Sequence, residues 1–367
     1  MKRAPLVGAV ALAASMAGLW REPAMFFAAW LGAWWWCLGL VLGCLVNAWL
    51  HVLTGGAWGA PLRAAALLLA RRMPWLLLGL VPLALGLKQL YAWAAQPQGP
   101  WLQAFARPAF VQAWLSQPFF LGRLGMYALV WWWLARPACL SGKGRAAASL
   151  ALYCFITSLA AVDLLMSLQP GWYSTAFGLV ALSAQALSGA AAAVLANALC
   201  APRRWRGASE GVPVWRDLGN LLLMWSTTWA YIAFMQFLII WAENLPREIA
   251  WYVPRLQTGW FYVALALALL QLLLPLAALL LRPVKDQPER LAVVAAVLLA
   301  ASMLDATWLV LPSVNPHSLS GWWLQPLTLA GMALLLFGGL PEALRGELAG
   351  APGDAGEEGC APWRALT

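Results

Sequence analysis

Charged residues are scarce in this chain of 367 residues. They make up 10% of the sequence, whereas hydrophobic residues make up 63%. A soluble globular protein carries about 25% charged residues, so this chain has too few to cover a water-facing surface. We therefore expect lipid to cover much of the protein. The net charge of +9 does not indicate nucleic-acid binding, because the basic residues stand singly between apolar stretches and form no patch.

The sequence also lacks the motifs of cofactor and metal sites. Its six cysteines are scattered and form no C-x-x-C pair, which argues against an iron–sulfur or zinc site. Its two histidines, His51 and His317, are expected on opposite sides of the membrane, roughly 30 Å apart, and a haem b needs two imidazoles at one depth. Motifs of nucleotide-binding loops, hydrolases and zinc proteases are missing too. We expect that this chain binds no redox cofactor or metal.

Long apolar stretches dominate what is present. A membrane-spanning helix needs about 20 apolar residues, and the 26 tryptophans suit the headgroup region of a bilayer. The expected class is an all-α integral membrane protein. Its ten expected spans lie near 4–20, 24–50, 74–95, 118–137, 146–168, 174–200, 217–241, 258–282, 289–312 and 320–341. The first stretch also fits a cleaved signal peptide, because Lys2 and Arg3 precede a short apolar run.

Basic residues are unevenly distributed between the two sides of this predicted topology. The connections on one side hold most of the lysines and arginines, and those on the other hold Arg21, Arg107, Arg247 and Arg255. The positive-inside rule then puts both termini in the cytoplasm. We predict one membrane domain over residues 1–341. Residues 342–367, rich in glycine, proline and acidic residues, are predicted to be a flexible cytoplasmic tail.

Short matches in a constant order indicate an internal repeat. Asn47-Ala48 and Asn197-Ala198 close two expected spans, and Asp163 and Asp305 each precede a proline by seven residues. The repeat units would be 24–168 and 174–312. Four spans separate the copies, so both have the same orientation. We expect two parallel four-helix bundles, made of helices 2–5 and 6–9, with helices 1 and 10 outside them.

Several polar side chains fall in the half of the bilayer that this topology makes periplasmic. Ionisable groups in lipid are costly and are candidates for function. Asp163 could pair with Arg123 or with Lys88. Together these residues predict either a polar site linked to protons or quinol, or a structural network between helices. The candidate network, also a candidate proton path, consists of Lys88, Arg123, Asp163, Gln236, Glu243 and Asp305.

Three blocks of sequence resemble one known family. They are TGGAWGAPLRAAALLLARRMPWLLLGLVPLALGLKQLYAWA (Thr54 to Ala94), DLLMSLQPGWYSTAFG (Asp163 to Gly178) and WAYIAFMQFLIIWAENLPREIAWYVPR (Trp229 to Arg255). They resemble the second polysulfide-reductase-type membrane subunit of alternative complex III, a bacterial quinol:cytochrome c oxidoreductase. The resemblance runs from about residue 30 to 315. It implies ten helices in two four-helix bundles, located in the bacterial inner membrane.

The resemblance also implies partners and site residues. The partners would be a sibling membrane subunit of the same type, an iron–sulfur subunit and multihaem cytochromes c, and these would hold the clusters and the haem c. Quinol or quinone is the implied substrate of the complex. Asp163 and Asp305 match acidic residues of the family. The loop after the seventh span matches at Glu243, Asn244, Pro246, Glu248 and Arg255.

The sequence departs from the family where histidines are common. Lys88, Gln271 and Ser302 stand at such positions, and Gly171 replaces another histidine. These changes weaken the case for proton transfer by this chain. The main hypothesis is a cofactor-free membrane subunit that supports quinol oxidation. A secondary transporter and a purely structural membrane anchor are the alternatives.

Overall fold

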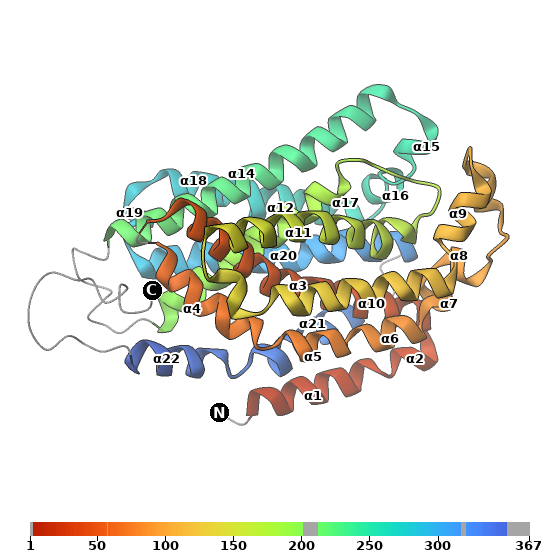
Figure 1. Cartoon of the computed structure of the whole chain (residues 1–367). Helices are drawn as coiled ribbons and strands as arrows, with labels where there is room; N and C mark the ends of the chain where they lie inside the picture. The colour runs from red at the N-terminus through yellow and green to blue at the C-terminus, as the bar shows by residue number, and fades with distance from the viewer. Residues whose placement is uncertain (1–2, 57, 201–211, 317–320, 351–367) are drawn as a thin grey trace, which may run out of the picture.

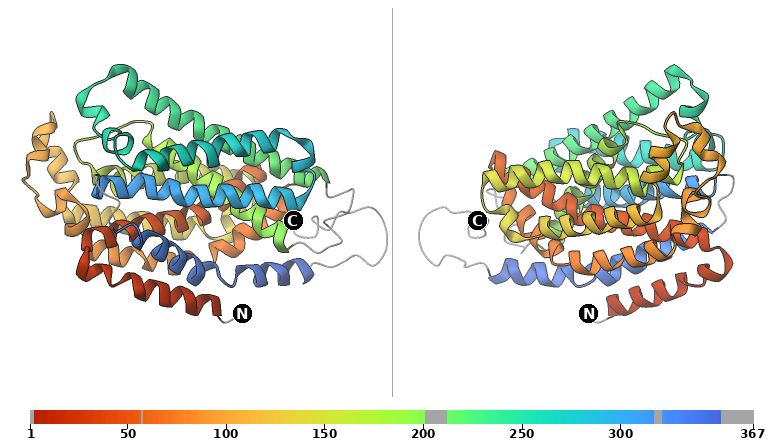
Figure 2. Two further views of the ribbon diagram at one scale, coloured as in Figure 1. Left: turned by 180° about the vertical axis from the view of Figure 1, so that it is seen from behind. Right: turned by 45° about the vertical axis from the view of Figure 1, so that its right-hand side comes forward.

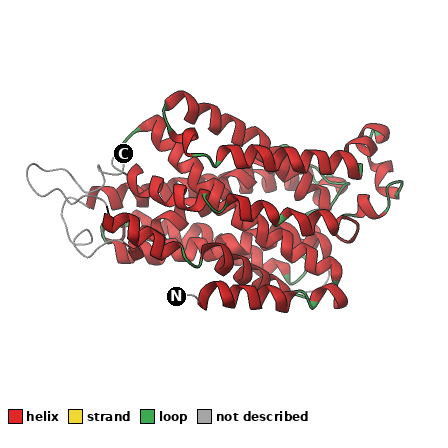
Figure 3. Cartoon of the chain, turned by 60° about the horizontal axis from the view of Figure 1, so that its bottom comes forward, coloured by secondary structure: helices red, strands yellow, loops and turns green. Residues whose placement is uncertain are grey.

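The computed structural model describes residues 3–56, 58–200, 212–316 and 321–350, and every regular element in these ranges is a helix (Figure 3). The first half contains α1 (Arg3–Ser15), α2 (Gly18–Arg21), α3 (Pro23–Thr54), α4 (Gly59–Ala70), α5 (Met73–Leu78), α6 (Leu80–Leu85), α7 (Leu87–Leu90), α8 (Ala92–Ala95), α9 (Pro108–Trp114), α10 (Gln117–Leu134) and α11 (Lys143–Leu164). The second half contains α12 (Phe177–Cys200), α14 (Val212–Glu243), α15 (Pro246–Ile249), α16 (Val253–Leu256), α17 (Trp260–Leu267), α18 (Leu274–Leu280), α19 (Arg282–Lys285), α20 (Pro288–Val314), α21 (Leu324–Phe337) and α22 (Leu340–Gly350). Short 3-10 turns are η1 (Pro100–Ala104), η2 (Pro137–Leu140) and η3 (Met166–Leu168), and η5 (Ala268–Leu273) is π-helical.

The all-α membrane class predicted from the sequence is confirmed. Within the described ranges, eight helices are long and apolar enough to span a bilayer, and a bent pair of helices makes up to nine. The helices run side by side as one elongated bundle (Figure 1). One end of the bundle, which we call the basic end, holds α4, α19 and α22. The opposite end holds α8, α9, α15 and α16.

One of the about ten expected spans is not a continuous helix. The expected span 74–95 is broken into α5 to α8 at Gly79, Gly86 and Tyr91, and two of these three residues are glycines, which weaken a helix. Tryptophans of α3 donate hydrogen bonds to carbonyls beside the first break. The indole nitrogen of Trp30 donates to the Gly79 carbonyl at 2.9 Å, and that of Trp34 to the Leu76 carbonyl at 2.8 Å. A backbone group left unpaired in lipid would cost several kcal/mol.

The expected span 118–137 forms one continuous helix. It corresponds to α10, which runs beside α11 and carries Arg123 and three consecutive tryptophans. It is not among the eight helices counted above.

The flexible tail was predicted to begin at residue 342, and this start is wrong. Residues 342–350 belong to α22, which begins with Pro341 in its first turn, where proline suits a helix. Leu344 of α22 is fully buried. Residues 351–367 lie outside the described part of the chain.

The centre of the bundle is formed by α3, α12 and α20, which pack against one another (Figures 1 and 2). Gly43 of α3 lies directly against α12, so that a Cβ atom on it would overlap the Gln185 carbonyl. Asn47, one turn further on, donates to the Ala186 carbonyl at 2.9 Å and accepts from Trp225 at 2.8 Å. Small residues allow membrane helices to approach closely, and polar groups then bridge them. The first helices of the two predicted repeat units are therefore in contact, while the repeat itself stays a prediction.

Candidate functional site

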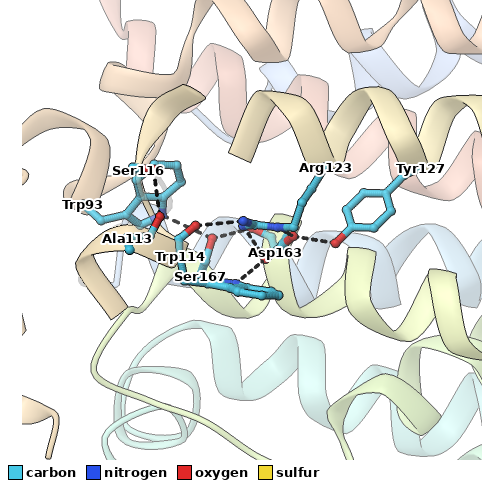
Figure 4. Close-up of polar contacts among 8 residues, drawn as sticks. All are labelled: Trp93, Ala113, Trp114, Ser116, Arg123, Tyr127, Asp163 and Ser167. Atoms are coloured by element: carbon cyan, nitrogen blue, oxygen red, sulfur yellow. Dashed lines mark hydrogen bonds and ion pairs between the residues drawn. The ribbon is translucent and has the colours of Figure 1, made fainter. Parts of the chain in front are cut away.

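Asp163 is the centre of a closed polar cluster near the end of α11 (Figure 4). Arg123 of α10 donates to its carboxylate through Nε at 2.6 Å and through Nη2 at 3.0 Å. The Tyr127 hydroxyl donates to it at 2.6 Å, and the Trp114 indole at 3.1 Å. A carboxylate offers about four acceptor directions, and here four donors occupy them.

Local helix geometry explains why these donors converge. Arg123 and Tyr127 are four residues apart on α10, so they share one face of that helix. Trp114 ends α9, and its carbonyl accepts a further bond from Arg123 at 2.9 Å. The Trp114 ring centre lies 4.1 Å from the guanidinium carbon of Arg123. Asp163 is 1% exposed and Arg123 7% exposed. The charges are therefore neutralised inside the protein, and this cluster fastens three segments together.

Lys88 does not join this cluster, so the network predicted from the sequence is wrong at this position. On α7, Leu87 and Leu90 face inward and are buried, which leaves Lys88 exposed on the outer face. The sequence left Arg123 and Lys88 open as partners of Asp163. The structure selects Arg123.

A second polar group lies where the chain leaves α14. Ser174 donates to the amide oxygen of Gln236 at 3.0 Å, and the amide nitrogen of Gln236 donates to the Tyr252 hydroxyl at 3.1 Å. Gln236 is buried. Burial raises the pKa of Tyr252 to about 12, so this phenol stays protonated at neutral pH.

Asp305 differs from Asp163 in having no partner among the described residues. It is 4% exposed on α20, and no described residue forms a hydrogen bond or ion pair with it. It borders a cavity of about 410 Å³ between α12, α14, α17 and α20, which we call the Asp305 cavity. Most of its walls are apolar or aromatic, and its polar side chains are Asp305, Gln236 and Tyr252. An unpartnered carboxyl group in such surroundings is costly to bury, and this marks it as a candidate for function.

The loop residues that match the family lie in different surroundings, some exposed and some buried. Glu243, Asn244 and Pro246 are exposed at the end of α14, so Glu243 does not belong to a buried network. Asn244 has a φ of 48°, a conformation in which asparagine often ends helices. The Glu248 carbonyl accepts from the Trp172 indole at 2.8 Å. The matched residues around the end of α14 therefore determine the path of the loop that follows this helix.

Arg255 is fully buried and anchors this loop to α20. It donates to the carbonyls of Trp251, Trp308 and Leu309 and to the Ser313 hydroxyl, at 2.8 to 3.3 Å. Its guanidinium carbon lies 3.5 Å from the Trp251 ring centre. The carbonyls near the end of a helix carry partial negative charge and stabilise a cation. Burial nevertheless lowers the pKa of Arg255 well below its usual value.

Two stacked tryptophans connect the halves of the chain. The rings of Trp172 and Trp251 are 5.0 Å apart and inclined by 19°. Trp251 lines the Asp305 cavity, and Trp172 lines a smaller cavity of about 280 Å³ that Asp163 also borders. Arg247 adds a second link by donating to the Gly171 carbonyl at 2.9 Å. The predicted single network is thus two separate clusters joined by an aromatic contact.

Comparison with known proteins gives no family for this chain. No family model matches it, and no curated protein matches it. Within the described ranges, no three histidine, cysteine, aspartate or glutamate side chains lie close enough to hold a metal ion. Function is therefore inferred from the geometry of the two clusters.

Proposed function

We propose that this chain is a membrane subunit of a bacterial quinol:cytochrome c oxidoreductase of the alternative complex III type, and that the Asp305 cavity admits the quinol head group. The observation that carries the proposal is the buried Asp305 carboxyl group, which has no partner among the described residues and faces an apolar cavity. Ligand pockets typically combine apolar walls with a few polar groups that orient the ligand. The sequence resemblance supports the same assignment.

The cavity supplies groups suited to a quinol. Oxidation of a quinol releases two electrons and two protons. In this proposal the Asp305 carboxylate accepts a proton from one quinol hydroxyl, while Gln236 or Tyr252 hydrogen bonds to the oxygen across the ring. The second proton passes from that oxygen to water outside the cavity. A haem c or an iron–sulfur cluster in a partner subunit would accept the two electrons. This chain contributes a binding site and a proton acceptor near the membrane surface.

The proposal is tested by two matched variants in native membranes. Asp305→Asn is expected to assemble normally but to lose most quinol:cytochrome c turnover. Asp163→Asn is expected to reduce the amount of assembled complex, because it breaks a structural ion pair. An azido-quinone should label the walls of the Asp305 cavity in the wild-type complex, and excess unlabelled quinone should prevent this. Normal turnover and unchanged labelling in Asp305→Asn would refute the proposal.

A purely structural membrane anchor is the second candidate. It is favoured by Asp163, whose carboxylate accepts from four donors, and by Arg255, whose guanidinium donates to four acceptors inside the protein. An anchor would assemble with cytochromes c and keep full turnover after replacement of Asp305. A secondary transporter has less support. Such proteins typically pair broken helices in both repeats, whereas α5 to α8 are broken and α14, their counterpart in the second predicted unit, is continuous.

Gentle solubilisation tests the proposed complex directly. The chain should co-purify with cytochromes c, and the haem absorption should disappear when the chain is stripped of its partners. Isolation from native membranes without any cytochrome would contradict membership of such a complex.

A further inference from the structure

A sharp turn at the basic end brings two arginines to the surface of the bundle. The chain bends by 47° between α4 and α5, and Arg71 and Arg72 form this turn. Arg72 is partly exposed, and Arg71 is exposed. Two grooves flank the turn, one on each side of α5.

The larger groove has a volume of about 520 Å³ and lies between α1, α3, α5 and α21. Arg72 is its charged residue, and its walls include Trp30, Trp75 and Leu335. Trp75 is 64% exposed and Leu335 45% exposed, so this groove opens toward the surroundings of the bundle. Its apolar walls suit a hydrocarbon chain.

The smaller groove has a volume of about 270 Å³ and lies between the α4–α5 turn and the end of α10. Arg71 and Arg136 line it together with Trp132. The guanidinium carbon of Arg136 lies 4.0 Å from the Trp132 ring centre, which orients this arginine at the rim of the groove. Among the described residues that line the two grooves, none is acidic. Both grooves therefore combine positive charge with apolar surface.

We propose that this region is a binding site for an anionic glycerophospholipid. The phosphodiester is bound beside the α4–α5 turn by Arg72 and Arg136, and the acyl chains lie in the two grooves. Guanidinium groups bind phosphate oxygens through paired hydrogen bonds, and basic pockets between membrane helices are known to bind anionic head groups. A soluble anion would leave the apolar walls uncovered, so the combination of surfaces favours a lipid.

The test compares two lipids that share their acyl chains and differ in head-group charge. Native mass spectrometry of the full chain in detergent would measure binding of dioleoyl phosphatidylglycerol and dioleoyl phosphatidylcholine. We expect the anionic lipid to bind more tightly. Each arginine near a membrane surface contributes about 1 kcal/mol to anionic lipid binding, so R72Q/R136Q should weaken phosphatidylglycerol binding roughly thirty-fold. Binding of phosphatidylcholine should not change.

Two further variants serve as controls. R282Q/R290Q removes the same charge from exposed positions at the basic end, outside both grooves, and should leave the preference intact. R72K/R136K keeps both charges and should retain most of the preference. The proposal is overturned if both glutamine pairs weaken binding equally, if the two lipids bind wild type equally, or if inorganic phosphate displaces phosphatidylglycerol at equal concentration.

Discussion

Replacing Asp163 by asparagine removes one negative charge from a position where four donors converge. Arg123 then lies buried at 7% exposure without a counter-ion, and at least one of its two bonds to residue 163 is lost. Breaking a buried ion pair from one side costs about 3–5 kcal/mol. We expect a loss of this size in the free energy of unfolding, since Asp163 is 1% exposed and water cannot replace the missing charge.

Unfolding in mixed micelles of dodecyl sulfate and a mild detergent, followed by tryptophan fluorescence, would measure this loss. Asp305→Asn is the matched control, because it makes the same chemical change at a buried carboxyl group that has no described partner. The control should change the free energy of unfolding by less than about 1 kcal/mol. The double variant Arg123→Met/Asp163→Leu should recover at least about 2 kcal/mol relative to Asp163→Asn, because it leaves no charge unpaired.

Equal losses in Asp163→Asn and Asp305→Asn would refute this reasoning. So would a loss below about 1 kcal/mol for Asp163→Asn, since the cluster would then contribute no more than an exposed ion pair.

Three further predictions concern helix packing, the loop anchor and pH. Gly43→Leu should prevent stable packing of α3 on α12, and the variant should aggregate in size-exclusion chromatography. Gly122 has open space around it, so Gly122→Ala should behave as wild type. Arg255→Gln should cost about 2–4 kcal/mol in the same unfolding assay and increase protease cleavage in the loop after α14, because buried carbonyls lose charged donors. Arg216, through its hydrogen bond, lowers the pKa of Asp286. The Arg216–Asp286 ion pair, which links α14 to the end of α19, therefore stabilises the folded state at any pH above the usual aspartate pKa. This stabilisation is lost as the pH falls through the lowered pKa of Asp286. Asp286→Asn should remove this acid-dependent part of the unfolding curve, and an unchanged curve would contradict the assignment.

Much of the fold could be predicted from composition and run length, because a bilayer demands long apolar helices. Prediction failed where helices break. Gly79 and Gly86 interrupt the expected span 74–95, and the new helical phase turns Lys88 outward. The choice between Lys88 and Arg123 as the partner of Asp163 depended on that phase. Sequence spacing alone did not reveal it.

The candidate site was predictable at four buried polar residues and not at its aromatic ones. Asp163, Arg123, Gln236 and Asp305 were identified because polar side chains in apolar spans are rare. Tyr127 could have been found from its spacing of four residues after Arg123. Trp114, one of 26 tryptophans in the chain, had no feature that distinguished it from the others. Asp163 and Asp305 lie in different clusters because of contacts between segments far apart in the chain. Such contacts cannot be predicted from a single sequence by spacing and composition.

The stacked indoles of Trp172 and Trp251 make the two cavities mechanically dependent on each other. Any molecule that displaces Trp251 must either separate the two rings or carry Trp172 with it, and Trp172 borders the cavity beside Asp163. The bond from Trp172 to the Glu248 carbonyl favours joint movement. A molecule that moved Trp251 in one half of the protein would therefore also change the wall of the cavity in the other half.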